Sequence, residues 1–176
     1  VRAGIVGTFP ALNQRTTEGY KEWVDEIRAA TADLPPEQAI FGVNLIVHPS
    51  NTRLEADVRA TVEKKVPLVI TSLGAVKLVV DAVHSYGGKV FHDVTTRRHA
   101  EKAVEAGVDG LILVTAGAGG HAGTGNPFAF LAEVRRFYKG AVTLTCALSN
   151  GAQVAAALAA GADFAYMGTR FIATSE

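Results

Sequence analysis

The sequence of 176 residues lacks several features that would point to a secreted, membrane-bound or nucleic-acid-binding protein. It has one cysteine, Cys146, so no disulfide can form within the chain. No apolar run approaches the roughly 20 residues of a membrane-spanning helix. Lys and Arg number 17, as do Asp and Glu, so no net charge and no basic block attracts nucleic acid or an anionic membrane. These absences predict a cytoplasmic protein whose partner is a small molecule.

The five histidines are also far apart and lack Asp, Glu or Cys neighbours at ligand spacing, so we predict no metal site. His84 and His99 lie in expected helices and are interpreted as surface residues. His92 precedes Asp93 at an expected strand end, and this pair suits a structural role at least as well as a chemical one.

The length fits one domain with a real core, and no shift in composition divides the chain, so we predict a single domain over residues 1–176. The first residues form neither a signal peptide nor a start-methionine sequence. We therefore expect the chain to begin inside a longer protein.

Apolar runs that suit strands alternate with segments of helical spacing along the whole chain. The expected strands are 3–8, 39–47, 66–71, 89–93, 109–115, 141–146 and 163–167. The expected helices start at Thr16–Thr17, run from Ser50 to about 64, cover 74–86 and 96–106, run from Asn126 to about 138, and end at Ala160. Glycines at 107 and 161 are expected to end helices in tight turns. A last segment opens at Gly168. Such alternation predicts a parallel sheet with helical crossovers.

Both an open doubly wound sheet and a closed barrel have this alternation. Polar residues at the ends of many strands and regular repeat lengths favour an α/β fold of the (β/α)8 TIM barrel type. The seven expected strands are one short of the eight that close such a barrel, so we expect a strand to be missing before Val1.

The segment 116–125 follows an expected strand and is rich in glycine, with five glycines in ten residues. Glycines allow the backbone to approach a ligand closely and to take positive φ values. His121 is the one side chain there that can transfer a proton near neutral pH. The alternative is a flexible connection whose histidine faces solvent.

In a parallel barrel the site lies at the C-terminal ends of the strands. The candidates there are Asn44, His48, Thr71, His92, Asp93, Thr115, His121, Cys146, Gly168 and Thr169. Gly168–Thr169 at a helix start and the loop 146–151 present backbone N–H groups and a hydroxyl, which suit a phosphate. The alternative is that both segments are ordinary βα turns with helix caps.

Three motifs carry a resemblance to a known family. They are the FGVNL strand at 41–45, the GGHxG loop at 119–123 and the MGTRF segment at 167–171. In this order and spacing they resemble the FMN-dependent nitronate monooxygenases, once called 2-nitropropane dioxygenases, a group that includes FMN-dependent enoyl-acyl-carrier-protein reductases. That family has a TIM barrel with a first FMN-contacting strand and a C-terminal helical part, and we expect both to be absent here.

The resemblance implies specific roles. His121 would be the catalytic base or hydrogen-bonding group above the flavin, with Gly119 contacting the cofactor. Asn44 would face the flavin ring. The phosphate of FMN would be held by Ala147, Met167, Gly168 and Thr169. The chain departs from the family pattern in three places: Cys146–Ala147 replaces a frequent pair of glycines, Val114 replaces a polar residue, and Asp93 stands where some relatives have Lys.

The function that the resemblance implies is FMN-dependent oxidation of alkyl nitronates, or nitroalkanes, to carbonyl compounds and nitrite with O2. The alternatives are an FMN-dependent NAD(P)H reductase, such as an enoyl-acyl-carrier-protein reductase, and a truncated barrel without catalysis. The oligomeric state and the physiological substrate do not follow from the sequence.

Overall fold

The computed structural model describes residues 1–74, 76–119, 123–172 and 174. The chain forms two compact units, Val1–Phe91 and His92–Glu176. The single domain over 1–176 stays a prediction.

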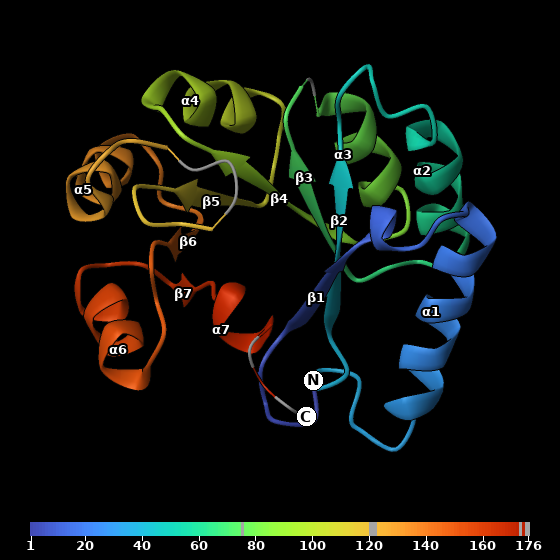
Figure 1. The fold of residues 1–176 in the computed structure, drawn as a ribbon. Coiled ribbons are helices and arrows are strands. Elements are labelled where there is room, and N and C mark those ends of the chain that lie inside the picture. The colour runs from blue at the N-terminus through green and yellow to red at the C-terminus, as the bar shows by residue number, and fades with distance from the viewer. Residues whose placement is uncertain (75, 120–122, 173, 175–176) are drawn as a thin grey trace. The chain divides into compact units, whose positions relative to one another are not determined.

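The first unit is a parallel sheet of three described strands in chain order, β1, β2 and β3, with helices along one side of it (Figure 1). Helix α2 packs between α1 and α3. The elements are β1 Gly7–Pro10, the 3₁₀ turn η1 Ala11–Asn13, α1 Thr17–Ala30, β2 Phe41–Ile46, α2 Leu54–Glu63, β3 Leu68–Ser72 and α3 Lys77–His84. Strand β4, Lys89–Val94, carries the chain into the second unit.

The core of the first unit is built from the strand residues that the sequence showed as a continuous apolar run. Val43, Leu45 and Val69 are fully buried, as are Tyr20 and Val24 of α1. Burying a side chain such as Val or Leu contributes about 1.5–3 kcal/mol. Burial of these strand and helix side chains therefore stabilises the unit.

Two expected boundaries in this unit were wrong. Strand β1 starts at Gly7 rather than residue 3, because Gly4 has φ +76° and its amide closes a turn onto the Val1 carbonyl at 2.9 Å. Helix α2 starts at Leu54 rather than at Ser50. The Ser50 hydroxyl bonds the His48 Nδ1 at 2.8 Å instead of capping a helix.

The start of α3 was also misplaced, at residue 74 rather than Lys77. Gly74 has φ +67°, and a Cβ there would lie 1.9 Å from the Val47 carbonyl oxygen. Glycine is required here because the backbones of two strand-end loops approach each other closely. The same conformation prevents residue 74 from starting a helix.

Polar side chains of α1 and α2 form a buried network around Asp57. Its Oδ1 accepts hydrogen bonds from the Thr17 hydroxyl at 2.6 Å and from Arg53 Nη2 at 3.1 Å. The Thr61 hydroxyl donates to the Asp57 carbonyl at 2.7 Å and shares a 2.7 Å bond with the Tyr20 hydroxyl. The network joins the two helices, and its Tyr20, Asp57 and Thr61 are fully buried.

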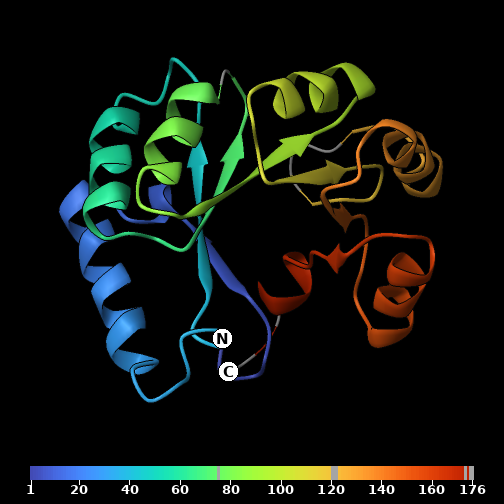
Figure 2. The ribbon, with the colours of Figure 1, turned by 180° about the vertical axis from the view of Figure 1, so that it is seen from behind.

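The second unit repeats the same pattern, with parallel strands β5, β6 and β7 in chain order and helices packed beside them (Figure 2). Helices α4 and α5 contact each other. Its elements are α4 Arg97–Glu105, β5 Gly110–Val114, α5 Pro127–Phe137, β6 Ala141–Thr145, α6 Gly151–Ala159, β7 Phe164–Ala165 and α7 Thr169–Ile172. The fully buried Leu111, Leu113, Leu131 and Leu144 belong to its core.

Several local predictions in the second unit are confirmed. The helix expected over 96–106 forms as α4, and the Thr96 hydroxyl caps it by accepting from the His99 amide at 3.2 Å. Gly107 and Gly161 follow helices with φ +87° and +106°, the conformation expected of a glycine after a helix end. Strand β7 is shorter than the expected 163–167, although the Asp163 and Tyr166 amides still bond to β6.

Candidate cofactor and substrate site

The chain segments after β5 and β6 bond to each other beyond the last regular strand pair, Val114 with Thr145. The Thr115 amide and the Thr115 hydroxyl both donate to the Thr145 carbonyl, at 3.2 and 3.0 Å. One step further, the Ala147 amide donates to the Gly117 carbonyl at 2.8 Å. The start of the glycine loop is therefore held against the turn that follows β6.

Two glycines of this loop lie close to neighbouring segments of the chain. Gly117 has φ +86°, and a Cβ there would lie 3.1 Å from the Cβ of Ala147, which itself has φ +22°. A Cβ at Gly119 would lie 2.8 Å from the Thr169 Oγ1. The structure thus brings together Gly119 and Thr169, two residues that the family resemblance assigned to one cofactor site.

The far end of the loop returns to the strand from which it left. The Gly123 amide donates to the Val114 carbonyl at 3.2 Å, and the Ala116 amide donates to the Gly125 carbonyl at 3.0 Å. The loop is closed at its base. The predicted catalytic residue, His121, lies outside the described residues, so its role stays a prediction.

The residues predicted to hold a phosphate differ in what they offer. The Ala147 amide is already used by the Gly117 carbonyl, so it is not a ready donor. Met167 is half-buried, and Gly168 and Thr169 are exposed. A Cβ at Gly168 would meet no atom within 4 Å, so open space lies beside that backbone. The cofactor contacts of these residues stay predictions.

Asn44 belongs to the first unit and lies on β2. Its Nδ2 donates to the Ser72 hydroxyl, at the end of β3, at 2.7 Å. This bond leaves the carbonyl Oδ1 as the group with which Asn44 can accept from a ligand. Sequence reasoning missed Ser72 because the two residues are 28 positions apart and only the strand register brings them together.

The remaining strand-end candidates are buried to different degrees. Burial raises the pKa of the Cys146 thiol, and a hydrogen bond with Thr115 opposes that rise. His92 is buried and Asp93 is half-buried, and both interact with other residues. His48 is exposed and bonds to Ser50.

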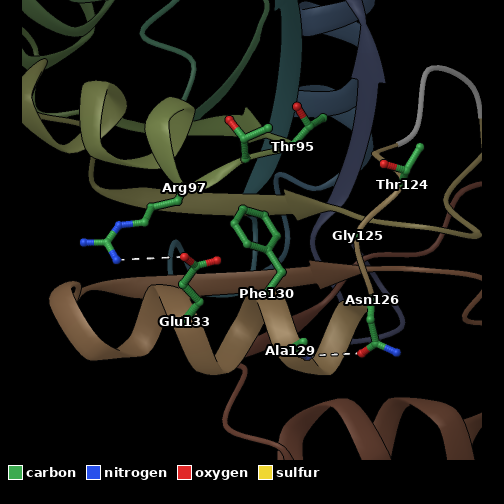
Figure 3. Close-up of a pocket in the computed structure, with 9 residues that line it drawn as sticks. Thr95, Arg97, Thr124, Gly125, Asn126, Ala129, Phe130 and Glu133 are labelled. Atoms are coloured by element: carbon green, nitrogen blue, oxygen red, sulfur yellow. Dashed lines mark hydrogen bonds and ion pairs between the residues drawn. The ribbon is translucent and has the colours of Figure 1, made fainter.

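A pocket of about 380 Å³ lies beside the end of the glycine loop, between the starts of α4 and α5 (Figure 3). It is lined by Thr95, Thr96, Arg97, Thr124, Gly125, Asn126, Ala129, Phe130 and Glu133. The Arg97 guanidinium points toward the Glu133 carboxylate at 3.9 Å, bonds Glu101 at 2.7 Å and stacks over Phe137. Because the arginine is already paired, it offers little attraction to an anion.

The repeating parallel strands and glycine-lined strand ends define an α/β enzyme fold of the (β/α) barrel class, as the sequence predicted. The chain belongs to the nitronate monooxygenase family, whose model matches residues 10–176. It is 34% identical to a nitronate monooxygenase of Neurospora crassa over 112 residues, which cover 58% of this chain and 30% of that protein. Both names are those of oxidoreductases.

Solved structures give the same fold. Nitroalkane oxidase from Streptomyces ansochromogenes matches with a TM-score of 0.82 at 23% identity, over 98% of this chain and 60% of that one. FabK from Thermotoga maritima matches with a TM-score of 0.71 at 31% identity, over 86% of this chain and 49% of that one. The chain therefore spans only part of the length of the proteins that it matches.

No helix among the described residues has the length and apolar character to cross a membrane. No group of three or more His, Cys, Asp and Glu side chains in the described part of the chain is placed to hold a metal ion.

Proposed function

We propose that the full-length protein binds FMN noncovalently and oxidises alkyl nitronates to carbonyl compounds and nitrite with O2. Membership of the nitronate monooxygenase family supports this proposal. The observation that carries it in this chain is the approach of the bare Gly119 backbone to the Thr169 hydroxyl, since a Cβ at position 119 would lie 2.8 Å from the Thr169 Oγ1.

The residues at this place fit the phosphate end of FMN. A phosphate needs hydrogen-bond donors that it can approach without obstruction by side chains. Thr169 has an exposed hydroxyl, and the space beside Gly168 is open. We assign the phosphate contacts to Met167, Gly168 and Thr169. Ala147 would contact the cofactor through its methyl or carbonyl group, since its amide is engaged.

At the ring end, the Asn44 carbonyl is available to accept a hydrogen bond from the isoalloxazine, because the amide nitrogen is bonded to Ser72. When bound, FMN supplies the redox chemistry of the reaction. The chain itself must bind the nitronate anion and move one proton when a neutral nitroalkane is the substrate. We assign both tasks to His121, the general acid/base of the glycine loop.

Oxygen consumption by purified full-length protein tests the proposed function. With ethylnitronate or propionate 3-nitronate we expect turnover that needs FMN but no nicotinamide. A strict requirement for NADH would replace the proposal with the reductase alternative. A protein that stays colourless after incubation with FMN would refute the cofactor assignment.

A pair of glycine variants tests the location of the phosphate. Gly168→Ala and Gly125→Ala each add a methyl group that meets no protein atom within 4 Å, and neither glycine has a positive φ. Both variants should therefore fold like the parent. Only Gly168→Ala should weaken FMN binding, because its methyl group would occupy the space assigned to the phosphate. Equal affinities for the two variants, measured by flavin fluorescence titration, would place the phosphate elsewhere.

A further inference from the structure

Thr115 connects the base of the glycine loop to Thr145, the last residue of β6. Its side chain is 1% exposed, and its hydroxyl and amide donate to one acceptor, the Thr145 carbonyl. A carbonyl oxygen has two lone pairs, so it can accept both bonds. The two residues lie 30 positions apart in the sequence, Thr115 directly after β5 and Thr145 at the end of β6. The hydroxyl bond is thus an addition to the sheet, made by this side chain alone.

The turn that this bond supports has a backbone conformation that needs support. Ala147 has φ +22°, a value that residues with a side chain rarely take and that persists only where the surroundings hold it. Its amide is held by the Gly117 carbonyl at 2.8 Å, and Gly117 has φ +86°. The loop segment at Gly117 and the turn at Ala147 therefore hold each other in place. Thr115 links the two strands at the point where these segments begin.

We propose that Thr115 is a positioning residue whose buried hydroxyl holds the base of the glycine loop, residues 115–119, and the turn Cys146–Ala147 in one fixed arrangement. The inference rests on the proposed function, in which both segments contact the cofactor. If they are fixed together, loss of the hydroxyl must affect cofactor affinity and turnover at the same time. A residue that merely contributed to the core would change stability alone.

Three variants of the full-length protein test this role. Thr115→Val keeps the shape and the amide bond but removes the hydroxyl, and Thr115→Ser retains the hydroxyl. Thr143→Val is the matched control, because Thr143 is a buried threonine within β6, away from the loop.

The first measurement needs neither FMN nor activity. Amide hydrogen exchange at Ala147 should be slow in the parent, although the residue is exposed, because the amide is bonded to Gly117. It should become about 10-fold faster in Thr115→Val, as expected for the loss of one hydrogen bond, and stay near the parent rate in Thr115→Ser and Thr143→Val. Free-peptide exchange at Ala147 in the parent would overturn the proposal without any variant.

The second measurement concerns FMN affinity and kcat of the loaded enzyme. Thr115→Val should raise the Kd for FMN about 10-fold and lower kcat, while its Tm falls no further than that of Thr143→Val. Thr115→Ser should restore both quantities. Parent-like affinity and kcat in Thr115→Val, or a serine variant that restores neither, would refute the positioning role. Absence of FMN binding in the parent would refute the proposed function but leave the exchange result standing.

Discussion

The Asp57 network of the first unit and the glycine loop of the second unit show two different uses of polar groups away from water. Around Asp57, side chains of α1 and α2 fill the space and bond to each other. At the loop, backbone amides and carbonyls make the bonds, and glycines keep side chains out. A buried carboxylate beside threonine and tyrosine has the composition of a catalytic site, yet the Asp57 network serves to join two helices. The space that glycines keep open is the better indication of a ligand.

The largest effect should come from the loop. We expect His121→Ala to retain FMN, because backbone groups do the holding, and to lose about 10²- to 10⁴-fold in kcat, the usual contribution of general acid/base catalysis. The loss should be larger with a neutral nitroalkane than with a preformed nitronate, since only the former must give up a proton. A loaded variant that oxidises both forms at the parent rate would show that the histidine faces solvent.

Removing the Asp57 carboxylate should disrupt the polar network of the first unit. Asp57→Ala leaves the Arg53 guanidinium, which is 22% exposed, without its buried partner. We expect a loss of about 3–5 kcal/mol in the free energy of unfolding, measured by urea denaturation. Glu55→Ala is the control: it removes an exposed ion pair with Arg59 on the same helix and should cost a small fraction of that. A change in FMN affinity without loss of stability in Asp57→Ala would mean that the network serves the site.

The same network should make the protein sensitive to alkali. Burial raises the pKa of Tyr20 from its ordinary value of 10.0 to about 12. Below pH 10 the phenol is protonated in both states, and between pH 10 and 12 only the folded state retains the proton, so stability falls as pH rises through this window. The shift corresponds to about 3 kcal/mol. The free energy of unfolding of Tyr20→Phe should fall less steeply with pH across this window than that of the parent. An unchanged dependence on pH in alkaline denaturation would contradict the assignment.

The smallest expected effect is that of substituting Asn126, which lies between the glycine loop and α5. The Asn126 side chain caps α5 by accepting from the Phe128 and Ala129 amides at 3.0 and 3.1 Å. Asn126→Ala should lower stability by about 1 kcal/mol. Asn150→Ala, which removes the cap of α6 at the Gln153 amide, is the matched variant. If Asn126→Ala weakens FMN binding far more than Asn150→Ala does, the end of the loop is part of the site and not just its boundary.

Much of the fold could be predicted because its determinants are local. The caps at Thr16, Thr96 and Asn126 and the glycines after helices depend on a few neighbouring residues, and all lie where the pattern indicated. One of the errors has a non-local cause. Gly74 was read as a helix start, although its conformation is set by the backbone of Val47, which belongs to another loop.

For the site, the sequence by itself determined which residues stand at strand ends and that half of the residues in the loop at 116–125 are glycines. Family motifs supplied their candidate roles. Only the tertiary structure decided that Gly119 faces Thr169, that the Ala147 amide is already bonded, and that Thr115 joins two strand ends. Such pairings depend on strand register and on the path of each loop beyond its strand. No local pattern encodes them, because each partner is far away along the chain.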